Sequence, residues 1–549
     1  MNLLDYAVLY VVFSHYAFAL GKYRITFTRL IFTTVKMPKR FWMIVAGLLI
    51  GVHSQAQYWL GVSSSNYAGT NSLFLNPAHA ADSRYKLYIN LVGNDIYLMN
   101  NYIRWGAPYS IFGIMTNTVP KKHRSARGAI IWQEEYYRER LNGERKHLHT
   151  GGDLRGPSLL YSFKNNRFAI GLTSRGRYAL SLTDVEQTTA RVIRFGTDNK
   201  ELQDQDFRSQ QAKLNTNGFL EMGATFGAVV ADYDEHFLKV GATVKRLVGV
   251  YNVHADLRNA DYRIWVESLN RDREFIVVQN LDATYGYTTG DAFDNIRLNP
   301  KFLFGKASAG GSWGGDLGVV YEYRPDFDAY TRKVPKLGKE PDPSKNKYKY
   351  RISAAITDIG RLNYKNINYI REIDVQKARD EFSYTEFDRA NTTSKALAAL
   401  NKSLLVNPDN FPRTFKVGLP LAANVSFDYH HSGPWYVNAT WIQGLRGGNY
   451  MDIKPLSVLA VTPRFETRWV EFSTPLSLYD NYRALSIGLA ARLGPLIVGT
   501  DHMTGLFGLG NPQGANLYFG LYVPFIHRKP SESIKCWFPP YEKTMKRKR

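Results

Sequence analysis

The sequence predicts an all-β protein: a transmembrane antiparallel β-barrel of about fourteen strands, with long loops and an N-terminal segment that can plug the lumen. Three observations support this fold class. Apolar and polar residues alternate along much of the chain, an export signal precedes them, and no later apolar stretch reaches the roughly 18 residues of a spanning helix. A membrane-embedded chain without spanning helices must cross the bilayer as a closed barrel.

The alternation is clearest between Lys416 and Tyr429. Successive side chains of a strand point to opposite faces, so the odd positions form an apolar face and the even positions a polar one that carries Asn424 and Asp428. Pro420 removes one backbone donor, and a bulge there would exchange the faces on one side. The pattern recurs in residues 168–175, 238–245, 316–324, 351–357, 435–441, 485–493 and 516–525.

Weaker alternation completes the strand count. Each predicted strand has about ten residues, the length that crosses a bilayer at a tilt, and the total is about fourteen. The weaker segments lie near 86–93, 157–163, 219–230, 273–279, 467–473 and 495–502.

The N-terminal region has the layout of a secretory signal. A basic start at 37–40 is followed by an apolar run from Phe41 to Val52 and by small residues up to Ala56, where cleavage is expected. We interpret residues 1–36 as an upstream extension from a mis-assigned start, with Met37 as the initiator; a longer signal region or a membrane anchor is the alternative. The predicted organisation is a signal peptide (37–56), an N-terminal lumenal segment (57–84), the barrel (85–527) and a basic tail (528–549).

The charge balance bears on partners. The chain has 70 Lys and Arg against 48 Asp and Glu, a net charge of +22, and no recognisable nucleic-acid module. We therefore expect outer-membrane lipid and the phosphates of lipopolysaccharide as partners, and no nucleic acid. The alternative is an ordinary solvated basic surface. Cys536 is the single cysteine, which rules out an intramolecular disulfide.

Four positions are candidate lumen or plug residues besides Asp428. Asn76 and Pro77 either place an N-terminal plug inside the barrel or form a turn before the first strand, since Asn-Pro favours turns. Asp358 is either a lumen carboxylate that helps to gate or bind a solute, or a turn-capping residue at a strand end. Asn424 lies with Asp428 on the polar face of its strand.

No catalytic, cofactor or metal site is predicted. The glycine-rich stretches 310–315 and 508–514 do not open a helix after a parallel strand, as a phosphate loop would. The histidine pairs lack a third ligand at a useful spacing, and no serine or threonine is singled out as a nucleophile. We expect a protein that is not an enzyme and has no cofactor.

Three short motifs carry a resemblance. Tyr67–Ala78, with its Asn-Pro-Ala, resembles a segment of barrels related to long-chain fatty acid transporters, and Ala355–Gly360 and Leu496–Asp501 accompany it. The chain thereby resembles an uncharacterised Bacteroidota family of outer-membrane barrels, which is similar to fatty-acid-transporter-like barrels and to those that accompany type IX secretion and gliding motility. The resemblance covers most of residues 58–527. It implies a barrel in the cell outer membrane whose N-terminal segment enters the lumen, and no particular substrate; the tail 529–549 departs from the pattern.

Two functions remain open at this point. The first is a conduit for small hydrophobic or amphipathic solutes, with apolar as well as charged lumen residues and a displaceable plug. The alternative is a non-transporting structural barrel that binds a partner protein of a secretion or surface-attachment complex. Such a barrel predicts a filled lumen and a large exposed aromatic patch on its loops or periplasmic turns.

Overall fold

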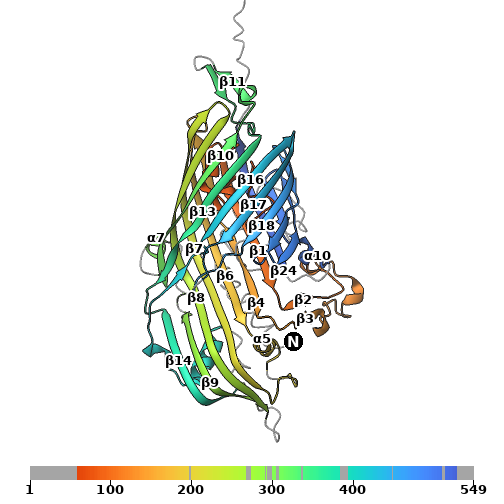
Figure 1. Cartoon of the computed structure of the whole chain (residues 1–549), viewed down its shortest axis with the longest axis vertical. Coiled ribbons are helices and arrows are strands. Elements are labelled where there is room, and N and C mark those ends of the chain that lie inside the picture. Colours follow the sequence, from red (N-terminus) through yellow and green to blue (C-terminus); the bar gives the residue numbers. More distant parts are fainter. Residues whose placement is uncertain are drawn as a thin grey trace, which may run out of the picture.

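The wall of the molecule is a closed antiparallel barrel of fourteen strands (Figure 1). The computed structural model describes residues 58–527 apart from 197–198, 267–273, 291, 293–298, 305–307, 335–337, 384–392, 448 and 510–513, so the predicted signal peptide and basic tail lie outside the described residues. The wall closes through β1–β24 pairing, and some strands are interrupted. In order they are β1 (Tyr85–Asn100), β4 (Lys146–Arg155) with β5 (Ser158–Phe163), β6 (Phe168–Val185), β7 (Asp206–Tyr233), β8 (His236–Val266), β10 (Gly310–Tyr323), β13 (Tyr350–Tyr364), β15 (Phe415–Gly418) with β16 (Ala422–Ser432), β17 (Trp435–Gly444), β18 (Val458–Glu466), β19 (Val470–Ser473) with β20 (Leu476–Tyr479), β21 (Ala484–Ile487) with β22 (Leu489–Leu493), β23 (Leu496–Thr500) and β24 (Gly514–Ile526).

The two ends of the barrel differ in their connections. We call the end drawn uppermost in Figure 1 the turn end. It has tight turns at Asn165–Asn166 and Gly433, where the backbone has positive φ. One longer connection, 324–349, carries the hairpin of β11 (Thr331–Val334) and β12 (Gly338–Pro341). The Pro and Lys content of 335–347 is typical of an exposed loop, but Lys347 at its end is buried against Asp82.

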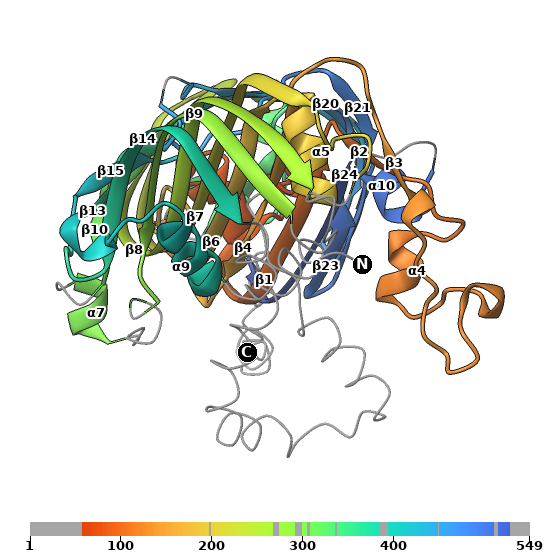
Figure 2. The same cartoon turned by 90° about the horizontal axis from the view of Figure 1, so that it is seen from below.

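Long connections and short helices gather at the other end, the loop end (Figures 1 and 2). Here β7 and β8 run far beyond the predicted ten residues. β9 (Glu274–Thr288) pairs with β8, and β14 (Ile370–Ser383) pairs with β9, which forms an extension sheet. The predicted strand at 273–279 therefore belongs to this extension and not to the wall. The helices are α4 (Ile111–Met115), α5 (Gln187–Phe195), α7 (Pro300–Phe304), α9 (Thr393–Ser403) and α10 (Met503–Phe507), and no helix among the described residues is long and apolar enough to span a membrane.

Helix α9 explains how the extension sheet leaves the wall without exposing its apolar face. Its Leu397 and Leu400 pack on Tyr285, Tyr287 and Ile373 of β9 and β14. Residues 394–405 are rich in the helix formers Ala, Leu and Lys, which favours a helix there. The helix is present, and the structure places it against the extension sheet.

The outward face of the wall is apolar, as predicted. Val425 and Phe427 of β16 are exposed while Asn424 and Asp428 are buried, which confirms the predicted faces for residues 422–429. The same prediction is wrong for Val417 and Leu419, which are buried inside. The reason is a break in the wall at 419–421, between β15 and β16, where Pro420 cannot continue the ladder.

One wall strand escaped prediction. β18 carries Pro463, which demotes such a segment in a sequence-based assignment. In the barrel, Pro463 lies opposite the break between β19 and β20 and only its carbonyl is used there, accepting from the amide of Thr474. A missing donor is tolerated because the neighbouring strand is itself interrupted.

Candidate functional site: the filled barrel interior

The N-terminal segment, residues 58–84, lies inside the barrel. It contains the short turns η1 (Gly69–Phe74) and η2 (Pro77–Ala80), and most of its residues are buried. Trp59 stacks on Tyr518 of β24 with ring centroids 5.0 Å apart, and the guanidinium of Arg155 lies 3.9 Å from the Trp59 ring centroid. On the far side of the barrel the segment contacts β10, β13 and β16, so it crosses the interior.

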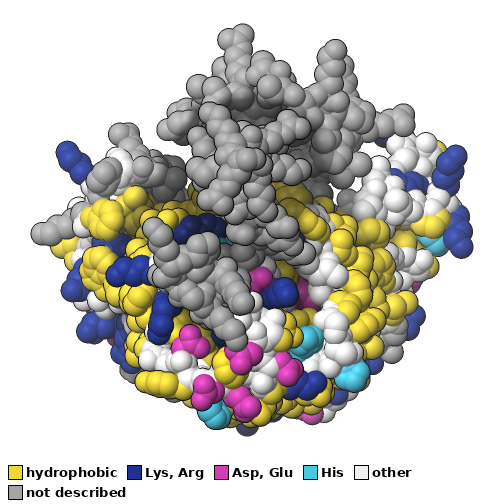
Figure 3. Space-filling view, turned by 90° about the horizontal axis from the view of Figure 1, so that it is seen from above, with side chains coloured by type: hydrophobic (Ala, Val, Ile, Leu, Met, Phe, Trp, Pro, Cys, Tyr) yellow, Lys and Arg dark blue, Asp and Glu magenta, His cyan; other side chains and the backbone are white. Residues whose placement is uncertain are grey.

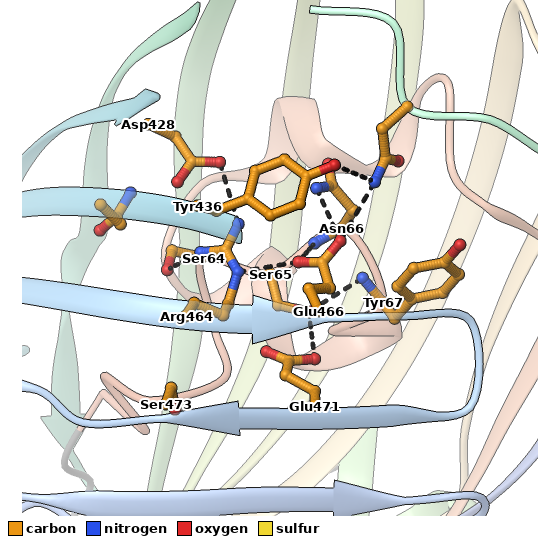
Figure 4. A network of polar contacts seen from close by, with 12 residues as sticks. Ser64, Ser65, Asn66, Tyr67, Asp428, Tyr436, Arg464, Glu466, Glu471 and Ser473 are labelled. Carbon is orange, nitrogen blue, oxygen red and sulfur yellow. Dashed lines mark hydrogen bonds and ion pairs between the residues drawn. The ribbon is translucent and has the colours of Figure 1, made fainter. Parts of the chain in front are cut away.

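Near the turn end, a buried polar network holds the segment (Figure 4). Asp428 accepts hydrogen bonds from Tyr348 at 2.6 Å, Arg351 at 3.0 Å and Arg464 at 3.1 Å. Arg464 also lies 2.8 Å from Glu466. Asp428, a predicted lumen residue, is thus in the interior as the hub of an ion-pair network.

The segment itself completes this network. The side chain of Asn66 donates to Glu466 at 2.9 Å, Ser65 donates to Glu471 at 2.9 Å, and Arg351 donates to the carbonyl of Ser64 at 2.6 Å. Buried charges are tolerated only when paired and hydrogen-bonded, so the segment and the wall charges depend on each other.

A second set of tethers lies where the segment leaves this end. Asp82 pairs with Arg84 and Arg324, each at 2.7 Å, and with Lys347 at 3.6 Å. Lys347 is in the connection before β13, outside the wall strands. Burial lowers the pKa of Lys347 to about 8 although Asp82 opposes the shift, so the charge of this tether varies close to neutral pH.

The Asn76-Pro77 turn sits on a patch of wall without side chains. Gly227, Gly241 and Gly318 lie opposite one another on β7, β8 and β10. A Cβ on Gly241 would overlap the backbone of Pro77, and one on Gly318 would overlap the amide of Asn76. Only glycine permits this close approach of two backbones.

Asn76 locks the turn from within. Its side chain accepts from the amide of Ala78 at 2.9 Å and donates to the carbonyls of Val319 and Ala354, each at 3.1 Å. Asn424 approaches the same place from β16 and donates to the carbonyl of Leu75 at 3.0 Å. The structure therefore brings Asn76, Pro77 and Asn424 together in the middle of the barrel interior.

The glycine patch gives a direct prediction. Gly241→Ala should destabilise the folded barrel by about 1–3 kcal/mol, because the extra methyl overpacks a filled site. It should also make residues 58–84 sensitive to protease in the purified protein. Gly176→Ala is the matched control, because its added Cβ meets only Leu220 at 3.5 Å. Equal stability and equal protease resistance of the two variants would contradict the role of the patch.

Asp358 belongs to a different cluster, nearer the loop end. It lies in the middle of β13 and does not cap a turn at a strand end, because the strand continues to Tyr364. Its φ of +58° marks an irregularity where β10 and β13 change register. Its carboxylate lies 2.7 Å from Lys245 and 2.9 Å from Arg177.

The cluster around Asp358 is fully paired. Lys245 also lies 2.7 Å from Asp316, and Arg175 lies 2.9 Å from Glu221. The backbone amide of Asp358 donates to Asp316 at 2.7 Å. These charges come from β6, β7, β8, β10 and β13, and they close the interior on one side.

Between this cluster and the N-terminal segment lies a cavity of about 50 Å³. The connection 445–457 between β17 and β18 forms its loop-end side. Apolar and aromatic side chains line much of it, with Lys454 and the paired arginines beside them. The apolar and aromatic ones are Tyr58, Phe74, Leu75, Tyr97, Tyr178, Ala179, Phe219, Pro420, Ile453, Pro455, Leu456, Val458 and Tyr479.

Several functional residues were not predicted from the sequence. Arg464 and Glu466 were missed because β18 was missed, although their two-residue spacing places both on one face. The glycines at 227, 241 and 318 carry no local signal, because their meaning depends on strands that pair across the barrel. Among the described residues, no group of His, Cys, Asp and Glu side chains is placed to hold a metal ion.

A family model matches residues 77–501, more than half of the chain. The chain belongs to the Family of unknown function (DUF5723). No curated protein matches it. The matched region covers the Asn76-Pro77 turn only from Pro77 onward, together with Asp358, Asn424 and Asp428.

Several solved structures are similar to this chain over most of its length, at low identity. A TodX monoaromatic hydrocarbon channel mutant has 9% identity and a TM-score of 0.36, and covers 85% of this chain and 98% of that one. The Ralstonia pickettii toluene transporter TbuX has 10% identity, a TM-score of 0.35 and coverages of 84% and 95%. A Pseudomonas aeruginosa FadL homologue has 10% identity, a TM-score of 0.29 and coverages of 86% and 99%. Likeness this distant says nothing of what the present chain binds, and the Bacteroidota origin and the link with type IX secretion stay predictions.

Proposed function

We propose that this protein is an outer-membrane conduit for small hydrophobic or amphipathic solutes, in a state closed by residues 58–84. The carrying observation is the interior cavity, whose lining is largely apolar and aromatic and which is bounded on one side by Tyr58, Phe74 and Leu75 of a segment that is not part of the wall. A barrel closed by its own wall side chains could not open without unfolding. One closed by a separate segment can open when that segment moves.

The orientation follows from the connections. Outer-membrane barrels have short periplasmic turns and longer outer loops. The turn end therefore faces the periplasm, and the extension sheet faces outward. A solute arriving from outside meets the connection 445–457 and the cavity before it meets the N-terminal segment.

The lining favours an amphipathic solute. Phe74, Phe219 and Ile453 offer apolar surface, while Lys454 lines the same cavity and makes no ion pair among the described contacts. The arginines beside it are already paired with wall carboxylates. A solute with an apolar body and a polar or anionic end suits this lining.

The closed state is too small for passage. A cavity of about 50 Å³ can hold water, whereas ligand pockets measure roughly 300–1,000 Å³. Conduction therefore requires displacement of residues 58–84 or of the connection 445–457. We assign the displacement to residues 58–84, because this segment crosses the barrel interior and would still block it if the connection 445–457 alone moved.

A reversible lock tests the proposal. A Cβ on Gly227 would lie 3.4 Å from the Cβ of Ala81, just below the usual range for a disulfide, and 2.9 Å from the Cβ of Ala80 and the backbone nitrogen of Ala81. Residues 80–81 must therefore shift slightly to accept the cysteine. Gly227→Cys with Ala81→Cys, in a Cys536→Ser background, should fold when reduced and fix the segment to the wall when oxidised. The readout is uptake of an apolar fluorophore by cells with an intact outer membrane, with folding checked by heat-modifiable gel migration.

The wild type and the reduced double variant should raise uptake over cells with an empty vector, and oxidation should abolish the increase. The single-cysteine variants control for the extra Cβ atoms and should respond to neither oxidant nor reductant. No uptake by wild-type protein above the vector level would overturn the conduit. Equal uptake in both redox states would show that residues 58–84 are not the moving part.

The second candidate, a non-transporting barrel that binds a partner protein, is favoured by one observation. The interior is filled and its charges are paired, as a structural barrel requires. Absence of uptake in the wild type would support the partner-binding barrel over the conduit.

A further inference from the structure

A folded flap projects sideways from the loop end of the barrel (Figure 2). It comprises residues 103–139 and contains β2 (Ile103–Trp105), α4, the short turns η3 (Lys121–His123) and η4 (Glu134–Tyr136), and β3 (Tyr137–Glu139). It leaves the wall directly after β1, beside β24, away from the long extensions of β7 and β8. β24 has 13 residues, close to the roughly 9–11 that cross a membrane.

The flap has its own fixed structure. β2 pairs with β3, Tyr109 donates to the carbonyl of Ile131 at 2.6 Å, and Trp105 donates to the carbonyl of Tyr109 at 3.0 Å. Arg124 is used internally and donates to the carbonyls of Val119 and Gly128. The arrangement of its exposed side chains is therefore set by the fold.

One set of exposed side chains is apolar. Phe112 and Met115 of α4 are exposed, and the Phe112 ring lies 5.1 Å from the ring of Phe507 in α10. Leu509, just after α10, is also exposed. Two connections that are distant in sequence thus build one apolar patch beside the outer edge of the wall.

The other exposed set is basic. Lys121, Lys122 and Arg127 are exposed and make no hydrogen bond or ion pair among the described contacts. From 103 to 133 the flap has no acidic residue; its glutamates are Glu134 and Glu135 in η4 and Glu139 in β3. Figure 3, a view from the turn end, shows Lys and Arg side chains at the right-hand edge, where the flap projects.

We propose that the flap docks on the outer leaflet of the membrane and binds its phosphorylated lipid headgroups. This inference rests on the outer-membrane placement of the proposed function. Apolar side chains next to unpaired cations, at the level where the wall ends, match the boundary between acyl chains and anionic headgroups. Phe112, Met115 and Phe507 enter the acyl boundary, and Lys121, Lys122 and Arg127 contact phosphates.

Lipid binding tests the basic part. The full-length protein in detergent is titrated with bis-phosphorylated lipid A and the bound lipid is counted by native mass spectrometry. The variant Lys121→Gln/Lys122→Gln/Arg127→Gln should bind at least tenfold more weakly, because each basic residue near an anionic surface contributes about fivefold. The control removes three other exposed lysines of the loop end, by Lys200→Gln/Lys301→Gln/Lys365→Gln, and should bind like the wild type.

Equal binding by the wild type and the flap variant overturns the inference, as does equal binding of dephosphorylated lipid A. All five substituted lysines and Arg127 are exposed, so folding is retained and is checked by heat-modifiable migration. The readout does not depend on solute passage. A protein that shows no uptake but binds lipid A through the flap leaves this inference standing, and the reverse result removes only this inference.

A depth measurement tests the apolar part. Met115→Cys in the Cys536→Ser background is labelled with a fluorophore and reconstituted into nanodiscs that contain brominated lipid. The label should be quenched, whereas a label on Glu201→Cys, in the loop-end connection before β7, should not. Absence of quenching at position 115 would show that the flap stands clear of the membrane.

Discussion

Replacing Arg464 by methionine should destabilise the folded barrel by about 3–5 kcal/mol, the typical effect of removing one partner from a buried ion pair. Arg464 is fully buried between Asp428 and Glu466 and stacks its guanidinium on Tyr436. Methionine fills much of the space but leaves two carboxylates with one fewer cation. The measurement is urea unfolding of the refolded protein in lipid vesicles, followed by tryptophan fluorescence.

If Arg464 acts through its charge, its effect on stability should depend on Glu466. Glu466→Gln in the same background removes one of the stranded carboxylates, while Arg351 still pairs with Asp428 at 3.0 Å. The double variant should therefore be more stable than the sum of the two single changes predicts, by about 0.5–3 kcal/mol. Simple additivity would mean that Arg464 acts through packing and not through charge.

How far the sequence predicts this structure depends on which contacts set each feature. Alternation located most wall strands, because lipid on one side and a polar interior on the other act on each strand separately. It could not tell β9 from a wall strand. Whether an alternating strand enters the bilayer or the extension sheet depends on α9, which covers it more than a hundred residues later.

The interior was predicted only in part for the same reason. Alternation placed Asp428 and Asn424 inside, and local sequence placed Asn76 and Pro77 in a turn. That turn packs on a row of glycines from three strands, and no local sequence pattern shows that these glycines align. Asp358 was rated as a strand end because Gly360 follows it, whereas the structure continues the strand through a residue with positive φ.

The filled interior also changes which substitutions report on the wall. In an open pore, lumen positions accept large polar side chains, but Asn424 here donates to both Leu75 and Thr357. An arginine at position 424 would displace the N-terminal segment and would destabilise the barrel for reasons unrelated to lipid. Whether the wall crosses a bilayer must therefore be tested with substitutions on its outward face alone, at positions that differ in their depth in the membrane.

Val437→Arg should lower the stability of the barrel in lipid vesicles by about 2–4 kcal/mol, the effect of a charge on the lipid face near the bilayer midplane. Val437 is exposed on β17 between Trp435 and Trp441, two outward tryptophans of the kind that mark the membrane interfaces. Leu485→Arg is the control, because Leu485 is also exposed but lies next to the loop-end turn at 480–483. The same charge can reach water there, so the loss of stability should be only about 0–1 kcal/mol. Both variants are compared by urea unfolding in vesicles and again in detergent micelles, which let a charged side chain reach water more easily. We expect the two variants to differ strongly in stability in vesicles and only slightly in micelles. Equal losses of stability in vesicles would show that β17 does not cross a bilayer between its two tryptophans.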